Sequence, residues 1–269
     1  MIQVNNVTLQ FGSRVLFDNV NLKFTRGNCY GIIGANGAGK STFLKVLSGD
    51  LEPNKGDVTI DKNERMSVLQ QNQNAYDEYT VLDTVMWGHK ALMQIKCERD
   101  ALYAKEDFSD EDGVRAGELE GEFGEMGGYE AEASAEALLN SLKVDPSVFY
   151  TPMADVDAKV KVKVLLAQAL FFKPDILILD EPTNNLDAKT AKWLEDYLME
   201  LDETTIIIVS HNRHFLNRVC THICDVDFKQ IRIYVGNYDF WYESSQLALR
   251  QAKEQNKKLE ARAKELQEF

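Results

Sequence analysis

The sequence predicts an α/β fold with an antiparallel β subdomain at its N-terminus, a core built on a parallel sheet, and a helical insert. Hydrophobic and polar residues alternate in two early segments, the pattern of half-buried strands: residues 7–11 and 20–24. Three later runs are almost entirely apolar, as expected for parallel strands buried on both faces: residues 29–33, 176–179 and 205–209. Between the first and second of these runs, residues 84–142 are rich in Ala, Glu, Leu and Lys and favour helix.

The remaining core elements follow from the same patterns. Residues 42–47 have helical character after the glycine-rich loop that follows the first buried run, and residues 186–201 are predicted to form the crossover helix between the later two. Residues 231–235 alternate as a closing strand. From about Ser244 a long polar helix is expected, and it reaches Phe269 without a capping glycine or proline, which predicts that a longer protein continues beyond it.

Within the insert, Ser109 and Asp112 have the spacing of a capping box. A further helix is predicted over residues 129–142, with three residues on its apolar side: Ala137, Leu138 and Leu142. We interpret the insert as a helical subdomain that projects from the core.

Length and composition set limits on function. At 269 residues and 44% hydrophobic content, the chain can bury one substantial core with a small appendage. The sequence has no apolar run long enough to cross a bilayer, and its first residues do not resemble a signal peptide. The net charge of −13 argues against a protein that coats nucleic acid nonspecifically. We therefore expect a cytoplasmic protein with no membrane partner.

The four cysteines are too scattered for a disulfide framework and fit reduced thiols in a cytosol. Cys220 and Cys224 lie close enough to suggest zinc, but the three-residue gap and the lack of a second ligand pair favour buried structural thiols.

Charge is unevenly distributed along the chain. Residues 106–136 carry twelve acidic side chains and one basic one, whereas residues 247–269 carry six basic and four acidic ones. The acidic run is either a solvated helix face or a surface with a specific electrostatic role. The basic excess near the end suits either contact with RNA or a charged, exposed helix.

A glycine-rich loop follows the first buried strand and precedes a helix, which is the context that a phosphate-binding loop requires. Its residues fit the pattern G-x-x-x-x-G-K-[ST] and continue into the helix: Gly34, Ala35, Asn36, Gly37, Ala38, Gly39, Lys40, Ser41 and Thr42. Glycines let successive backbone N–H groups surround phosphate oxygens. Lys40 can reach the outer phosphates and the Ser41 hydroxyl can hold Mg²⁺, so ATP and Mg²⁺ are the predicted cofactors.

Two carboxylates follow the second buried strand, where ligands bind in parallel sheets. Asp180 is a candidate for orienting the magnesium shell, and Glu181 is the candidate general base that polarises the attacking water. His211 follows the third buried strand and is predicted to contact the γ-phosphate or to position Glu181 and water. No such argument applies to His214, which we interpret as structural.

Together these motifs resemble the ATP-binding cassette (ABC) family along nearly the whole chain, which implies a P-loop ATPase. By this resemblance Phe11 stacks on adenine, and Gln71 senses magnesium and the γ-phosphate. Gln70 is the competing candidate for that glutamine, and we favour Gln71. The segment at residues 184–187, with Asn185 and Asp187, matches the one that contacts the opposite domain of a dimer.

One motif departs from the family's pattern. Where the family carries Leu-Ser-Gly-Gly-Gln or -Glu before a helix, this chain has Val-Asp-Ala-Lys-Val at residues 156–160. In the family these serine and glycine amides cap the γ-phosphate held by the partner domain. Asp157 in the serine's place brings a carboxylate towards a polyanion, and Ala158 and Lys159 lose backbone freedom. We expect the composite site that uses this signature to be weak, and binding to be a safer expectation than turnover for this chain alone.

Several features resemble the ABC-F branch, whose members are soluble, carry two cassettes in one chain and act on ribosomes. They are the asparagine-containing stretch at residues 180–187, the short arm-like insert, and the stretch at 235–241 that leads into a charged helix. The resemblance implies an ATPase domain over residues 1–243 with its insert at about 84–142, and the start of an interdomain linker at residues 244–269. It also implies a second cassette in the same full-length chain, and a ribosome with its rRNA and tRNA, as partners.

Three functions remain open at this point. The first is an ATP-driven conformational switch on the ribosome, which acts as a translation factor. The second is the ATPase subunit of a membrane transporter, which needs a hydrophobic cleft for a coupling helix. The third is a regulatory ATP-binding module with little turnover, suggested by the altered signature.

Overall fold

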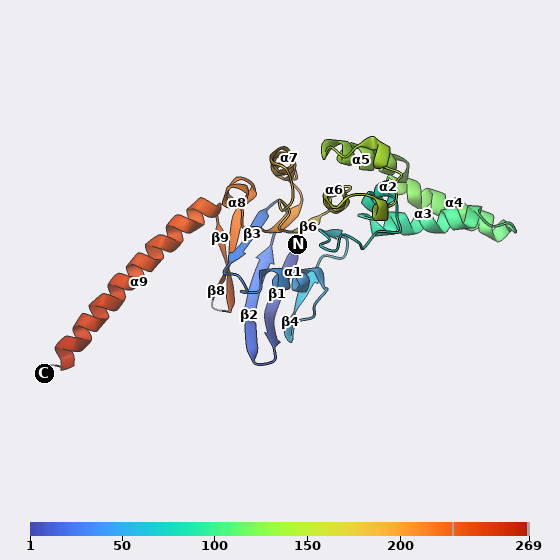
Figure 1. Ribbon diagram of the computed structural model, residues 1–269. Helices are drawn as coiled ribbons and strands as arrows, with labels where there is room; N and C mark the ends of the chain where they lie inside the picture. The colour runs from blue at the N-terminus through green and yellow to red at the C-terminus, as the bar shows by residue number, and fades with distance from the viewer. Residues whose placement is uncertain (228, 268–269) are drawn as a thin grey trace.

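The computed structural model of the protein describes residues 1–227 and 229–267, and in these residues nine strands form two sheets (Figure 1). The antiparallel sheet has the order β2-β1-β4, with β1 (Ile2–Phe11), β2 (Arg14–Phe24) and β4 (Lys55–Ile60). The larger sheet has the order β5-β6-β7-β3-β8-β9. Its strands are β3 (Cys29–Gly34), β5 (Met66–Val68), β6 (Ile176–Asp180), β7 (Thr205–Val209), β8 (His222–Asp227) and β9 (Gln230–Val235). All pair in parallel except β9, which closes the sheet antiparallel to β8. The predicted α/β class is confirmed.

The first two strands are longer than the alternation predicted. β1 and β2 begin at Ile2 and Arg14, whereas the sequence pattern indicated residues 7–11 and 20–24. Their pairing shifts register at three places between Val4 and Gln10, and Asn6 and Asn19 have positive φ angles of 50° and 52°. Each such bulge inserts a residue that breaks the two-residue period, so the sequence pattern shows only the regular part of each strand.

The larger sheet is covered on both faces, which explains why its central strands are almost entirely apolar. One face of β6 and β7 joins a hydrophobic cluster with α6 (Ala158–Leu170), α7 (Ala188–Met199) and α8 (Arg213–Val219). The other face joins a second cluster with α1 (Lys40–Ser48) and the antiparallel sheet. Leu177 and Ile178, neighbours on β6, therefore belong to different clusters, and both are fully buried.

The predicted helical insert is confirmed and forms an arm on one side of the core (Figure 1). It comprises α2 (Val81–Met86), α3 (Lys90–Tyr103), α4 (Asp110–Glu125) and α5 (Gly128–Ser141), followed by the short 3-10 helices η1 (Pro146–Val148) and η2 (Met153–Asp155). Helix α4 continues through Gly117 and Gly121, beside which a β-carbon would meet no atom within 4 Å. The chain turns after this helix at Gly127, whose φ angle is +76°.

The apolar side predicted for the helix after Gly128 is wrong in one residue. Ala131, Ala135 and Leu139 form the buried face of α5 and continue to Leu142, the 3.6-residue spacing of one helix face. Ala137 falls on the opposite side and is exposed, and Leu138 is only partly buried.

The long polar helix is α9 (Tyr238–Gln267), which begins before Ser244 and leaves the core on the side away from the arm (Figure 1). Its root is held by two contacts: the Trp241 indole N–H donates to Asp225 Oδ2 at 3.3 Å, and Asn217 and Asp239 exchange two hydrogen bonds. Four of the six basic residues predicted near the chain end lie outside the described side chains: Lys257, Lys258, Arg262 and Lys264.

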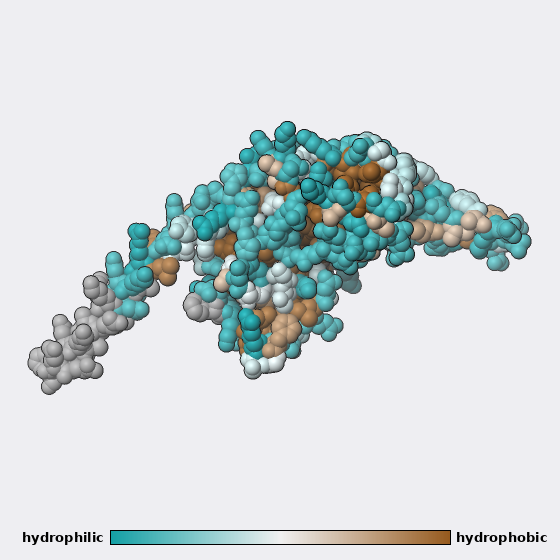
Figure 2. Space-filling model, viewed as in Figure 1, coloured by the Kyte–Doolittle hydropathy of each residue, from teal (hydrophilic) through white to brown (hydrophobic). Residues whose placement is uncertain are grey.

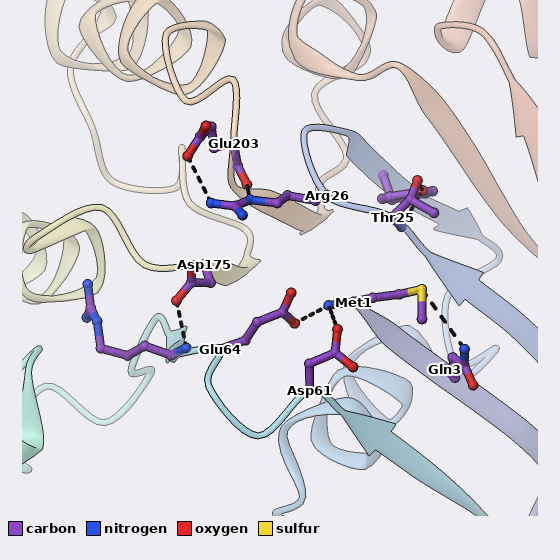
Figure 3. Close-up of polar contacts among 10 residues, drawn as sticks. Met1, Gln3, Thr25, Arg26, Asp61, Glu64, Asp175 and Glu203 are labelled. Carbon is purple, nitrogen blue, oxygen red and sulfur yellow. Dashed lines mark hydrogen bonds and ion pairs between the residues drawn. The ribbon is translucent and has the colours of Figure 1, made fainter.

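Polar contacts tie the antiparallel sheet and the loops to the core (Figure 3). The Met1 amino group donates to Asp61 and Glu64, beyond the far end of β4. Arg26, just after β2, donates to a side-chain oxygen of Glu203 at 2.8 Å and to its carbonyl oxygen at 2.9 Å, next to β7. The face of the molecule shown in Figure 2 is mostly hydrophilic.

Within the described residues, no helix is both long and apolar enough to cross a bilayer.

The cysteines behave as the sequence predicted. Cys29, Cys220 and Cys224 are buried free thiols, and burial raises the pKa of Cys224. Across the described part of the chain, His, Cys, Asp and Glu side chains form no group that could hold a metal ion by themselves. The burial of Cys220 and Cys224 agrees with their interpretation as structural thiols.

The capping box of α4 predicts a pH dependence. The Lys105 ammonium bonded to Asp112, with the N–H and O–H of Ser109, lowers the pKa of this carboxyl to about 2 from an ordinary 3.8. Because the folded state has the lower pKa, the stabilisation by Asp112 is complete above about pH 4 and is lost as the pH falls through about 2. We expect Asp112→Asn to reduce arm helicity, measured by circular dichroism, above about pH 4 and to match wild type near pH 2. The control is Asp107→Asn, outside the helix, and a difference from wild type that is constant across this pH range would contradict the prediction.

Candidate active site

The phosphate-binding loop joins the end of β3 to α1 in the geometry that its glycines predict. Gly39 precedes α1 with a φ angle of +102°, and a β-carbon there would lie 2.8 Å from the Phe17 ring. Gly34 approaches β8 so closely that a β-carbon would lie 2.6 Å from the Val226 carbonyl oxygen. Side chains at these two positions would therefore displace the loop from the strands that hold it.

Lys40 opens α1 and turns back into the loop. Its ammonium donates to the carbonyl oxygens of Gly34 at 2.9 Å and Ala35 at 3.1 Å, and the residue is only 8% exposed. The loop thus holds a cation at its centre, beside the N-terminal end of a helix. Both features favour an anion with several oxygens, such as a polyphosphate.

The carboxylates and the histidine meet at the same edge of the sheet. Asp180 ends β6 opposite Val209 of β7, and the Glu181 N–H donates to the Val209 carbonyl oxygen at 2.8 Å. Glu181 has a φ angle of 49°, an uncommon conformation for a side chain of this size. Its Oε2 accepts a 3.4 Å hydrogen bond from the His211 N–H, and His211 Nε2 lies 3.5 Å from its Oε1.

The second oxygen of Glu181 is left without a donor. Oε1 is buried and accepts no hydrogen bond from any described residue. A buried acceptor without a donor is costly, so this oxygen favours a water or ligand hydroxyl beside it. A carboxylate in that position can take a proton from an attacking water, the role predicted for Glu181.

A cavity of about 500 Å³ brings most of the predicted residues together. Its lining includes predicted residues from the hairpin, the loop and the sheet edge: Phe11, Asn36, Gly37, Gly39, Lys40, Ser41, Thr42, Asp180, Glu181 and His211. Phe11 is 53% exposed at its mouth, available to stack on a flat ring. Gly34, Ala35 and Ala38 belong to the loop but are not among the lining residues.

Sequence reasoning missed three residues of this cavity, Arg14, Leu16 and Val209. Val209 ends β7, whereas Arg14 and Leu16 lie on β2, and Arg14 pairs directly with Phe11 across the hairpin. The pairing of Phe11 with the start of the next strand is the signal that points to Arg14 and Leu16, but the contact of Arg14 with the Gly37 carbonyl oxygen joins residues 23 positions apart and leaves no local pattern in the sequence.

Gln71 lies at the metal side of the site. Its amide nitrogen donates to Asp180 Oδ2 at 2.7 Å, and both residues line a second cavity with Ser41. Gln70 lines the same cavity, but of the two glutamines only Gln71 donates a hydrogen bond to this carboxylate among the described residues. The hydrogen bond favours Gln71 over Gln70.

The donor set here fits Mg²⁺. A carboxylate, a hydroxyl and an amide oxygen are hard oxygen ligands, and Mg²⁺ commonly combines one or two carboxylates with nucleotide phosphates and water. Asp180, Ser41 and the amide oxygen of Gln71 would hold the ion, which would neutralise charge on the transferred phosphoryl group.

In the altered signature, the Asp157 side chain occupies the backbone N–H groups at the start of the following helix. Asp157 precedes α6, and its carboxylate accepts hydrogen bonds from the N–H groups of Lys159 at 2.7 Å and Val160 at 3.3 Å. These amides lie at the N-terminus of α6, where the family presents donors to a partner's phosphate. The helix end is thus already neutralised within this chain.

The residues predicted to contact an opposite domain lie on the surface beside the site. Asn185 is exposed with a φ angle of 64°. Asp187 caps α7 through the backbone N–H groups of Lys189 and Thr190. The Thr190 hydroxyl and N–H, with Lys163 nearby, lower the pKa of Asp187 to about 2. His214, interpreted as structural, lies 3.6 Å from a carboxylate oxygen of Glu195, away from the cavity.

The contact of Gln71 with Asp180 predicts which glutamine serves the metal. Gln71→Ala is expected to raise the Mg²⁺ concentration for half-maximal ATP hydrolysis by at least about tenfold, because it removes a ligand and a partner of Asp180. Gln70→Ala, a matched change one residue away, is expected to leave it unchanged. A larger effect at Gln70 would transfer the assignment to that residue.

Comparisons with known proteins agree with this geometry. Residues 17–184 match the ABC transporter family, and residues 224–269 match a second ABC transporter family. The chain is 61% identical over its full length to an uncharacterized ABC transporter ATP-binding protein, YkpA, of Bacillus subtilis, of which it covers 50%. It is 33% identical over 86% of its length to the energy-dependent translational throttle protein EttA of Mycobacterium tuberculosis, of which it covers 41%.

Solved structures show the same fold. An ATP-binding subunit of an ABC transporter superposes with a TM-score of 0.69 at 20% identity, over 92% of this chain and 94% of that one. A dimeric ATP-binding cassette in a post-hydrolysis state, bound to ADP and Pi, superposes with a TM-score of 0.63 at 21% identity, over 87% and 98%. The chain spans about half the length of the curated relatives it matches. With its phosphate loop, paired carboxylates and histidine on this fold, the chain belongs to the ATP-binding cassette family of ATPases, among relatives of the ABC-F type.

Proposed function

We propose that this chain is the first cassette of a two-cassette ATPase that works as an ATP-driven conformational switch on the ribosome, as a translation factor. The observation that carries the ATP-driven part is the cavity at the sheet edge. It gathers the lysine, both carboxylates and the histidine in one chain, and it leaves an oxygen of Glu181 free for water. The ribosomal part is supported by the similarity to a protein named as a translational throttle.

The site is built to be completed by a second domain. Phe11 and His211 lie at an open cavity, and the family places a partner's signature over the γ-phosphate. A second cassette in the same full-length chain is the proposed partner, since this chain spans about half of its relatives and a similar cassette forms dimers. ATP would close the two cassettes on each other, and hydrolysis would let them open.

The appendages suit a large external partner. The arm and α9 extend from opposite sides of the cassette, so a single large body such as the ribosome with its rRNA and tRNA can contact both (Figure 1). A cytoplasmic location and the absence of a membrane partner belong to the same proposal. We assign residues 1–243 to the ATPase domain and residues 244–269 to the start of the linker.

A transporter subunit finds less support in the surface. Its coupling helix needs a hydrophobic cleft, whereas the cavity between β5, the α2–α3 turn and α6 has charged and polar groups in its lining, including Arg65, His89 and Gln168. The third alternative is a regulatory module with little turnover. It is favoured by one observation: Asp157 caps α6 and occupies the N–H groups that the signature would offer to a partner's nucleotide.

Replacing the general base tests the switch. In the full-length protein, Glu181→Gln is expected to retain ATP binding, to slow hydrolysis by at least about 100-fold, and to increase the ribosome-bound fraction in sucrose gradients. The control is Glu203→Gln, a surface carboxylate paired with Arg26. Slow hydrolysis with an unchanged ribosome-bound fraction would contradict the ribosomal role and leave the ATPase assignment standing.

Restoring the family's signature residues tests whether capping by Asp157 limits hydrolysis. The triple change Asp157→Ser, Ala158→Gly and Lys159→Gly removes the carboxylate that caps the helix and restores backbone freedom beside it, and is expected to raise turnover by dimers of this chain at least about tenfold. Asp155→Ser, a carboxylate two residues earlier that does not cap α6, is the matched control. Unchanged turnover in the repaired chain would show that the signature's sequence is not what limits hydrolysis.

A further inference from the structure

Two cationic side chains reach the phosphate-binding loop, and only one of them belongs to its motif. Lys40 donates to the carbonyl oxygens of Gly34 and Ala35 from inside the loop. Arg14 comes from β2 and donates through Nη2 to the carbonyl oxygen of Gly37 at 2.9 Å. Both cations therefore contact the loop through neutral carbonyl oxygens, although phosphate oxygens are the stronger acceptors for either.

Arg14 lies between the two parts of the cavity that a nucleotide would span. It pairs with Phe11 across the β1–β2 hairpin, and its guanidinium contacts the middle of the phosphate loop. It lines the same cavity as Phe11, Lys40 and Ser41. A ligand whose ring stacks on Phe11 and whose phosphates enter the loop therefore passes along this side chain.

The charges that line the cavity show why a second cation matters. Among the described lining residues, Lys40 and Arg14 are cationic, Asp180 and Glu181 are acidic, and His211 completes the titratable set. Without Arg14 the carboxylates would outnumber the permanent cations two to one, around a ligand that is itself a polyanion. Arg14 thus supplies half of the permanent positive charge of this lining.

Arg14 also has the chemistry and the freedom to bind phosphate. A guanidinium carries five N–H donors in a planar fork that matches two phosphate oxygens at once. Among the described residues, only Nη2 of this guanidinium donates a hydrogen bond, and the side chain is exposed, so it can turn from the Gly37 carbonyl towards a ligand without disturbing the core.

We propose that Arg14 is a second phosphate ligand of this ATPase site, donating to the nucleotide's phosphate oxygens alongside Lys40. Its contact with Gly37 holds the side chain beside the loop, and its pairing with Phe11 links recognition of the ring to recognition of the phosphates. The residue then favours nucleotides by the number of their phosphates, independently of the base.

The affinities for ATP, ADP and AMP, measured by isothermal titration calorimetry in the presence of Mg²⁺, test this proposal. Arg14→Gln is expected to weaken ATP and ADP binding by about tenfold and AMP binding clearly less, because a charge-assisted contact to the outer phosphates is lost. Arg14→Lys is expected to recover part of the loss, since it keeps the charge without the fork. The ATP affinity of Arg14→Gln is also expected to fall less steeply with added salt than that of wild type.

Arg26→Gln is the matched control, because Arg26 lies just after the far end of the same strand and pairs with Glu203 outside the cavity (Figure 3). It is expected to leave all three affinities unchanged. An equal loss for ATP, ADP and AMP in Arg14→Gln would assign Arg14 to holding the loop through Gly37 and would overturn the proposal. Unchanged affinities would overturn it too, and the thermal midpoint of each variant without nucleotide confirms that it is folded.

Discussion

The parallel pairing of β6, β7 and β3 is the constraint on which the site depends. Because β7 lies between the other two, its backbone fixes the heights at which Asp180 and the start of the phosphate loop leave the sheet. A slip of one residue in either pairing would turn every buried side chain of that strand to the other face, into a different hydrophobic cluster. The two clusters that stabilise the sheet therefore also hold Glu181 in register with Lys40, and packing and catalysis share one geometry.

The signature shows how a small chemical change can separate two sites in one molecule. Asp157 stabilises its own helix by capping α6, and in doing so it occupies the donors that a partner's nucleotide would use. The site around Lys40 is unaffected, because its loop, carboxylates and histidine come from other elements. The chain thus has an intact nucleotide-binding site of its own and an altered signature for the site of a partner.

Local motifs made most of the site predictable from sequence, and long-range pairing hid the rest. The phosphate loop and the residues after each buried strand were located because strand, turn and ligand are adjacent in the chain. Arg14 was missed because its place beside the loop depends on a contact with Gly37, 23 residues along the chain, that no local motif encodes. Ala137 was assigned to the wrong face of its helix, because a run of alanines and leucines in α5 offers several apolar stripes. The glycines within α4 do not break the helix, because the packing of Leu119 and Phe123 outweighs the poor helix propensity of glycine.

The root of α9 connects the phosphate loop to a distant point. Asp225, which receives the Trp241 indole N–H, pairs with Ile33 on β3, the residue before Gly34. Helix α9 has 30 residues, so it is about 45 Å long, and a rotation of about 10° at its root would sweep its far end through about 8 Å. Helix α9 therefore acts as a lever whose base lies against the nucleotide-binding strand. A small movement of the strand next to the loop becomes a large displacement at the far end of the helix.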